Sequence, residues 1–318
     1  MTLLYADKIV KDYTLPRKSL FQKPPLFRAL NGVSLSIDKG ENYGVVGESG
    51  CGKSTLARII MALDKPTSGN VLFEGNDLFN ISGSRLQNLR RYFQMVFQDP
   101  YGSLNPRKKV LSIVSEPLDM LEKNLAGTER LDRVKEMLNE VGMNSDDVDK
   151  FPHEFSGGQR QRIAIARALI TKPSLIVADE SVSALDVSVQ AQVLNLMMDL
   201  QERHNLAFLF ISHDLSVVEF VTQKISVIYL GQIVEEGSTE VVFKDPRHPY
   251  TKLLISAIPS VDPLFKKEKR IGRANTLKVT EISCPFIDRC PIASEQCQHE
   301  SPSLEGAENH RVSCFNVQ

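Results

Sequence analysis

Short, continuous apolar segments alternate along the chain with longer amphipathic ones. Residues 42–46, 174–178, 206–211 and 225–229 are apolar runs, and runs of this length predict strands that are buried on both faces of a sheet. Apolar residues at helical spacing fall between these runs and predict amphipathic helices after residue 53 (Leu56, Ile59, Ile60, Leu63) and across residues 188–204 (Val189, Val193, Leu196, Leu200). The alternation predicts an α/β fold.

The pattern becomes polar and helical between about residues 84 and 157. The segments RLQNLRR, EPLDMLEKNL and RLDRVKEMLNEVGM lie in this range, and the last one reaches Gly142, a residue typical of helix ends. We therefore expect a helical subdomain, at about residues 84–157, inserted into a larger domain at 1–245, with a separate extension at 246–318. Further strands are predicted at Val33–Ile37 and Val71–Phe73.

Residues 47–55 read GESGCGKST and join the predicted strand at 42–46 to the following helix. Glycines at 47, 50 and 52 let the backbone curl until successive N–H groups face one anion, and the helix N-terminus adds to that field. The spacing predicts the phosphate loop of a P-loop NTPase, in which Lys53 reaches the β- and γ-phosphates and Ser54 ligates Mg²⁺. A ligand-free, glycine-rich turn is the alternative. The residues expected to contact nucleotide are Gly47, Glu48, Ser49, Gly50, Cys51, Gly52, Lys53, Ser54 and Thr55.

Two carboxylates, Asp179 and Glu180, follow the apolar run at 174–178. Ligands bind at the carboxyl ends of strands in open α/β sheets, so Asp179 would hold Mg²⁺ and Glu180 would orient or deprotonate the attacking water. An acidic strand end that faces solvent is the alternative. His213 follows the run at 206–211 and would reach the γ-phosphate only if its strand lies beside that of Asp179; otherwise it is a packed polar residue.

Taken in order, these elements resemble the ATP-binding cassette family across residues 1 to about 245. SGGQ at 156–159 resembles the family's signature motif, with Phe155 where leucine is commoner, and SALD at 183–186 resembles the loop that crosses to the opposite subunit. The chain departs from the family at Ser181, where proline usually follows the catalytic glutamate.

The resemblance implies ATP and Mg²⁺ as ligands and gives roles to residues beyond the phosphate loop. Gln98 would contact magnesium, water and the transmembrane partner, and would share the catalytic role with Glu180 and His213. Tyr13 would stack on adenine, although simple packing is an alternative for a single tyrosine. The remaining residues implied to bind nucleotide or magnesium are Asp179, Ser156, Gly157, Gly158, Gln159 and Asp186.

Three segments narrow the resemblance to the dipeptide and oligopeptide importer subfamily. They are PYGSLNPRKKV at 100–110, DPRHPYTKLLISAIP at 245–259 and a cysteine-bearing tail, while the basic insertion at 14–30 resembles the second of two paired ATPase subunits. The implied partners are a paired cassette ATPase (a heterodimer), two transmembrane permease subunits and, indirectly, an extracytoplasmic solute-binding protein. Dipeptide, longer peptide, nickel chelate and glutathione remain open as the solute.

Composition restricts the alternatives. Lys plus Arg number 38 against 39 Asp plus Glu, and the lack of a basic excess argues against nucleic acid as a partner. The longest apolar runs, such as 206–211, fall far short of the ~20 residues that span a bilayer. The first residues carry charges where a signal peptide needs an apolar stretch. We expect a cytosolic chain, peripheral at the cytoplasmic face of the inner membrane, rather than a fused exporter, a tandem-cassette ATPase of translation or repair, or an inactive regulatory module.

Four of the five cysteines, Cys284, Cys290, Cys297 and Cys314, have the spacing C-x5-C-x6-C-x16-C. A reducing cytosol disfavours disulfides, and four thiolates suit either tetrahedral zinc or a 4Fe-4S cluster. The close C-x2–4-C pair typical of zinc is missing from this spacing. The tail resembles that of peptide-importer ATPases that bind an iron–sulfur cluster, so we expect 4Fe-4S, with zinc and unliganded cysteines as the alternatives.

Overall fold

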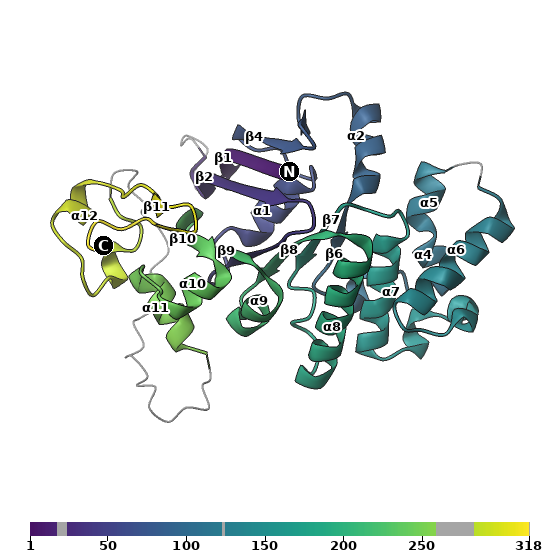
Figure 1. Ribbon diagram of the computed structural model, residues 1–318. Helices are drawn as coiled ribbons and strands as arrows, with labels where there is room; N and C mark the ends of the chain where they lie inside the picture. The colour runs from purple at the N-terminus through teal and green to yellow at the C-terminus, as the bar shows by residue number, and fades with distance from the viewer. Residues whose placement is uncertain (18–23, 123–124, 259–282, 318) are drawn as a thin grey trace.

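The computed structural model describes residues 1–17, 24–122, 125–258 and 283–317. Its main sheet contains the four strands predicted from the apolar runs (Figure 1). Neighbouring strands from β6 to β9 are parallel, and β10, β12 and β11 continue the sheet antiparallel beyond β9. Across the sheet the strands are β6 (Phe93–Val96), β7 (Leu175–Asp179), β8 (Ala207–Ser212), β3 (Asn42–Val46), β9 (Lys224–Tyr229), β10 (Gln232–Ser238), β12 (His310–Val312) and β11 (Glu305–Ala307).

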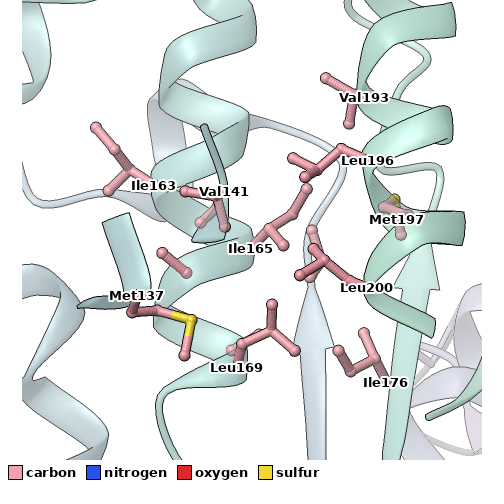
Figure 2. Close-up of a cluster of buried hydrophobic side chains, with 14 of the residues drawn as sticks. Met137, Val141, Ile163, Ile165, Leu169, Ile176, Val193, Leu196, Met197 and Leu200 are labelled. Carbon is pink, nitrogen blue, oxygen red and sulfur yellow. The ribbon is translucent and has the colours of Figure 1, made fainter. Parts of the chain in front are cut away.

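The central strands bury both faces in different cores. Leu175, Val177 and Leu209 pack with helix α1 (Lys53–Ile60), whereas Ile176 and Phe208 pack on the opposite face with α7 (Gly157–Leu169) and α8 (Val187–His204). Side chains alternate across a strand, so one continuous apolar run supplies both cores. Figure 2 shows the second core, where side chains of α7 and α8 meet beside β7: Ile165, Leu169, Leu196, Leu200 and Ile176.

A second, antiparallel sheet covers α1 from the other side (Figure 1). The predicted strands at Val33–Ile37 and Val71–Phe73 belong to this sheet, the first as part of a strand of 13 residues. The first strand of the chain pairs with both of them, and the sequence pattern did not reveal it. In order across the sheet, the strands are β2 (Leu26–Asp38), β1 (Thr2–Thr14), β4 (Ser68–Phe73) and β5 (Asn76–Asp77).

Short helices gather beyond β6, at the end of the main sheet opposite the extension (Figure 1). Strand β6 lies within the range 84–157 that was assigned to a helical subdomain, yet it pairs with β7 in the main sheet. Because β6 belongs to the core, the inserted helices begin only after it. Helix α2 (Gly83–Leu89) precedes β6. The helices that follow β6 are α3 (Pro100–Ser103), α4 (Val110–Val114), α5 (Glu116–Leu121) and α6 (Gly127–Glu140).

Two helix ends test the spacing argument. The helix after the phosphate loop was expected to include Leu63, but α1 ends at Ile60, and Ala62 has a φ of 50°. Leu63 therefore lies outside the helix with an exposed side chain, and its inward placement was wrong. The end predicted near Gly142 is confirmed, since α6 stops at Glu140 and Gly142 adopts a φ of 71°.

The C-terminal extension joins the main sheet. Strand β12 pairs with β10, so the predicted domains 1–245 and 246–318 share one sheet across their boundary. His310 on β12 contacts Glu235 on β10 at 2.7 Å, with both side chains buried. The remaining helices are α9 (Leu215–Val221), α10 (Thr239–Lys244), α11 (Pro249–Ser256) and α12 (Gln296–His299). Among the described residues, no helix is both long and apolar enough to cross a membrane.

Candidate nucleotide-binding site

The phosphate loop, residues 47–55, joins β3 to α1 as predicted. Gly47 has a φ of 154°, and a Cβ there would collide with the carbonyl oxygen of Ile228. Gly52 has a φ of 110°, and a Cβ there would lie 2.6 Å from the carbonyl oxygen of Ala29. Both positions need glycine for backbone conformation and for space, which accounts for the tight curl of the loop.

The loop's own backbone holds Lys53, whose side chain is buried. Its Nζ donates to the carbonyl oxygens of Gly47 and Glu48, at 2.7 and 3.1 Å. These bonds keep a cation inside the curl of the loop, at the N-terminus of α1, where backbone N–H groups also favour an anion. The remaining loop residues are Ser49, Gly50 and Ser54, which are exposed, Thr55, which is half-buried, and Cys51, which is buried with a thiol pKa raised by that burial.

Asp179 stands at the carboxyl end of β7 beside the loop. Burial raises the pKa of its carboxyl group, and a hydrogen bond from the Ser54 hydroxyl opposes this change. Oδ1 of Asp179 is buried and has no hydrogen-bond partner among the described residues. A buried carboxylate oxygen left unpaired beside a serine hydroxyl is a suitable ligand pair for Mg²⁺, so these residues fit the expected ion.

Glu180 and His213 come together as the strand order requires. Strands β7 and β8 are neighbours, with Asp179 opposite Ile211, so the condition set for His213 is met. Nδ1 of His213 lies 3.1 Å from Oε1 of Glu180, which is largely buried, while His213 is half-exposed. Glu180 adopts a φ of 48°, an uncommon conformation that its N–H bond to Ile211 helps to hold. A carboxylate and an imidazole this close together can position a water molecule for attack.

Gln98 and Tyr13 come from two further elements of the fold. Gln98 follows β6, the strand next to β7, and its side chain is exposed. Tyr13 is on β1, and its hydroxyl donates to Asp64 at 2.8 Å, while Nζ of Lys11 lies 5.0 Å from its ring centre. With the hydroxyl and one ring face engaged, adenine stacking would use the other face, and this role stays a prediction.

The signature loop, residues 156–159, begins α7. The Ser156 side chain accepts a bond from the N–H of Gln159, and Gln159 accepts one from the N–H of Ser156. This reciprocal capping explains why the helix starts at Gly157. Gly158 packs against α8 so closely that a Cβ would collide with Val189. Ser156 and Gln159 are exposed, and the loop therefore presents its polar groups outward.

Asp186 immediately precedes α8, the helix against which the signature loop packs, and its side chain is exposed. Ser181, where the family usually has proline, is buried behind Glu180. The Glu180 carbonyl oxygen accepts a bond from the Ser183 hydroxyl at 2.9 Å. The segment from Glu180 to Asp186 is thus held by local hydrogen bonds in place of a proline ring.

The four cysteines of the extension form one group. Burial, followed by the neighbouring thiols Cys297, Cys290 and Cys314, raises the pKa of Cys284 to about 11. The backbone N–H of Cys284 also donates to the carbonyl oxygen of Cys297. Within the described residues, however, no group of three or more His, Cys, Asp or Glu side chains is arranged to hold a metal ion. The geometry of the described residues therefore gives no support to the expected metal site, and the 4Fe-4S cluster stays a prediction.

One contact was missed by the sequence argument. Glu48 in the phosphate loop makes an ion pair with Arg289, which directly precedes Cys290 in the extension. The two residues are 241 positions apart, and neither belongs to a spacing pattern that joins them. No sequence signal predicts this contact.

Two family profiles match the chain. The one described as ABC transporter covers residues 30–183, and the one described as oligopeptide/dipeptide transporter, C-terminal region, covers residues 234–297. The dipeptide transport ATP-binding protein DppF of Haemophilus influenzae is 46% identical, over 97% of this chain and 95% of its own length. The oligopeptide transport ATP-binding protein OppF of Salmonella typhimurium is 45% identical, over 98% of this chain and 94% of its own length.

Solved structures agree with the fold. The ATP-binding cassette MJ0796, in a dimeric post-hydrolysis state with ADP and Pi, matches with a TM-score of 0.65 and 31% identity. The match covers 74% of this chain and 98% of that one. CbiO1 of Clostridium perfringens, part of the ABC transporter complex cbiONQ, also has a TM-score of 0.65, with 27% identity over 77% and 91% of the two chains.

Proposed function

The chain belongs to the ATP-binding cassette family of dipeptide and oligopeptide transport ATP-binding proteins, and we propose that it energises a binding-protein-dependent peptide importer. It is an ATPase of the transporter type. The observation that carries the transport proposal is that one chain matches both the ABC transporter family and the C-terminal region of oligopeptide/dipeptide transporters.

The two loops support a site shared between chains. Lys53 is buried within the curl of the phosphate loop, which can hold the chain's own ATP, whereas Ser156 and Gln159 are exposed. An exposed helix N-terminus can bind the γ-phosphate of a nucleotide held by another cassette. Two ATP molecules would then lie between this chain and a paired ATPase, a heterodimer in the subfamily arrangement expected above.

Hydrolysis follows from the residues at the carboxyl ends of β7 and β8. Glu180 accepts a proton from a water molecule as that water attacks the γ-phosphorus, and the bond to the β–γ bridging oxygen breaks to release ADP. Nδ1 of His213 lies 3.1 Å from the Glu180 carboxylate, and His213 would contact the γ-phosphate of bound ATP. Mg²⁺ held by Ser54, Asp179 and Gln98 would neutralise phosphate charge. Differential affinity of ATP for the closed pair would drive closure.

A groove beside Gln98 offers a docking place for the permease. It has a volume of about 350 Å³ and lies between β6 and the inserted helix α5. Three exposed apolar side chains line it: Leu63, Phe97 and Met120. A short cytoplasmic segment of each permease subunit would occupy this groove, and such docking would keep the chain peripheral at the cytoplasmic face of the membrane. The solute would be selected by the receptor and the permease.

The cysteine group would hold a 4Fe-4S cluster, with zinc as the alternative. The support is the donor chemistry: Cys290, Cys297 and Cys314 each lie close enough to a neighbouring thiol to raise its pKa, although burial is the largest cause of each shift. Metal binding needs thiolates, so loading would release protons and draw the four sulfurs together. Iron and sulfide analysis of anaerobically purified protein, with its absorption spectrum, tests this; zinc without sulfide, or four free thiols, would contradict it.

Affinity purification from native membranes tests the transport function. We expect two multi-span proteins and a sister ATPase to co-purify, and the reconstituted complex to hydrolyse ATP faster when receptor and peptide are added. Copurification with ribosomes or DNA, or hydrolysis indifferent to peptide and receptor, would contradict the proposal.

A further inference from the structure

The extension contacts the phosphate loop at Glu48. Nη1 and Nη2 of Arg289 donate to the two carboxylate oxygens of Glu48, each at 2.9 Å. This is a bidentate pair, the geometry in which arginine binds a carboxylate most strongly and most specifically. Arg289 is buried, while the Glu48 side chain is 41% exposed. The pair therefore links a rigid group in the extension to a more exposed group in the loop.

Aromatic rings fix the Arg289 side chain. Its guanidinium lies 5.7 Å from the ring centre of Tyr229 and 5.6 Å from that of Phe286. Both rings are buried, and they pack against each other and against Tyr250. The contact with Glu48 raises the already high pKa of Arg289, so the group stays charged. The aromatic packing leaves the guanidinium little freedom to leave Glu48.

A second contact from the extension holds the backbone of the same residue. The N–H of Glu48 donates to the hydroxyl of Tyr250, on α11, at 2.8 Å. The Glu48 carbonyl oxygen accepts from Lys53 at 3.1 Å, so all three groups of Glu48 are engaged. The residue thus lies between the extension on one side and the phosphate-binding lysine on the other.

An unpaired carboxylate at this place would oppose nucleotide binding. ATP carries several negative charges, and like charges within a few ångströms repel strongly where water is partly excluded. We propose that Arg289 is a positioning residue for ATP: it neutralises Glu48 and fixes it in the phosphate loop, so that the folded extension sets the affinity of the site. This inference rests on the proposed ATPase function.

Equilibrium binding of Mg-ATP to the full chain, together with KM and kcat of the assembled complex, tests the proposal. We expect Arg289→Ala to weaken ATP binding about tenfold and to raise KM by a similar factor, with kcat changed less than about twofold. Arg289→Lys should bind ATP more tightly than Arg289→Ala but less tightly than the unmodified chain, because lysine keeps the positive charge and cannot make the bidentate pair. Arg289→Gln, which keeps length and N–H donors, replaces the alanine variant if that one does not fold.

The decisive variant combines Arg289→Ala with Glu48→Gln. If Arg289 acts by neutralising Glu48, removing the carboxylate should restore ATP affinity to within about twofold of the unmodified chain. If Arg289 only fastens the extension to the core, the second substitution cannot repair it. Persistent weak binding in the double variant, or unchanged affinity in Arg289→Ala, overturns the proposal.

Arg311→Ala is the matched control. Arg311 is also an extension arginine paired with a core glutamate, Glu236 on β10, and Glu236 lies outside the phosphate loop. We expect ATP affinity in this variant to match that of the unmodified chain; an equal loss would show that the extension acts only by general attachment and would overturn the proposal. Failure of the unmodified chain to bind ATP would instead contradict the proposed function.

Discussion

The phosphate loop and the signature loop both lead into a helix N-terminus, but the two N-termini serve different purposes. Each ends in a helix N-terminus, at Lys53 in α1 and at Gly157 in α7. Lys53 is buried and donates to its own loop's carbonyl oxygens, whereas Ser156 and Gln159 are exposed and each side chain accepts a bond from the other's backbone N–H. The hydrogen bonds of the phosphate loop hold Lys53 where it can bind phosphate. The signature loop uses its own hydrogen bonds to cap α7, and its polar side chains remain exposed.

Surroundings account for this difference. The phosphate loop lies over the sheet and meets the extension through Glu48, so several elements restrict it. The signature loop is supported from behind, where Gly158 packs against α8 without room for a Cβ. Helix polarity attracts phosphate at both places, and the surroundings of each loop decide which chain's nucleotide it can reach.

The largest effect is expected where the phosphate loop meets its catalytic pair. Glu180→Gln keeps size and removes the base, so turnover of the assembled complex should fall roughly 10²–10⁴-fold while ATP binding persists. Steady-state hydrolysis and equilibrium nucleotide binding measure the two quantities. Glu219→Gln, at an exposed glutamate on α9, is the matched control and should leave both unchanged. Unaltered turnover in Glu180→Gln would show that the base lies elsewhere.

Acidic pH should loosen the support of the phosphate loop and leave the signature loop intact. Burial lowers the pKa of His248 from 6.5 to about 4, and its Nδ1 accepts the N–H of Tyr250 at 3.0 Å. Between these pH values the unfolded chain binds a proton that the folded chain does not, so the free energy of unfolding falls as pH drops from 6.5 towards 4. At about 1.4 kcal/mol for each pH unit, this contribution reaches at most about 3.5 kcal/mol.

His248→Asn checks the assignment, since asparagine can still cap α11 without titrating. Denaturant unfolding of the two proteins between pH 7 and pH 4.5 should show a shallower decline for the variant. Parallel curves would mean that other groups carry the acid sensitivity.

The smallest effect, a loss of about tenfold or more in ATP hydrolysis by the complex, is expected for a substitution that keeps the helix cap of the signature loop and disturbs phosphate binding. Ser156→Asp preserves an N-cap and suits the helix dipole, but it sets a negative charge against the phosphate of the neighbouring cassette. The complex should hydrolyse ATP more slowly, whereas the isolated chain should bind ATP normally and unfold at an unchanged temperature. Weaker binding by the isolated chain would place Ser156 in its own nucleotide site.

Much of the candidate site was predictable because its residues are neighbours in sequence. The phosphate loop, the carboxylates after β7 and the capping motif before α7 are contiguous, and their chemistry follows from local spacing. The contact between Glu180 and His213 could be predicted only on the condition that β7 lies beside β8, which the sequence pattern does not reveal. Strand β1 and the core strand β6 were missed, because their pairing partners come from distant segments.

The amino-acid sequence alone determined that the chain binds and hydrolyses nucleotide, because backbone curl, helix polarity and strand burial are local consequences of residue order. Only the tertiary structure decided that Lys53 is buried within its loop while Ser156 and Gln159 are exposed. It also decided that Arg289 contacts Glu48, although the two residues are 241 positions apart in the sequence. The physical reason is that a bidentate ion pair depends on position in space, and spatial neighbours are fixed by packing of the sheet and the extension rather than by spacing along the chain.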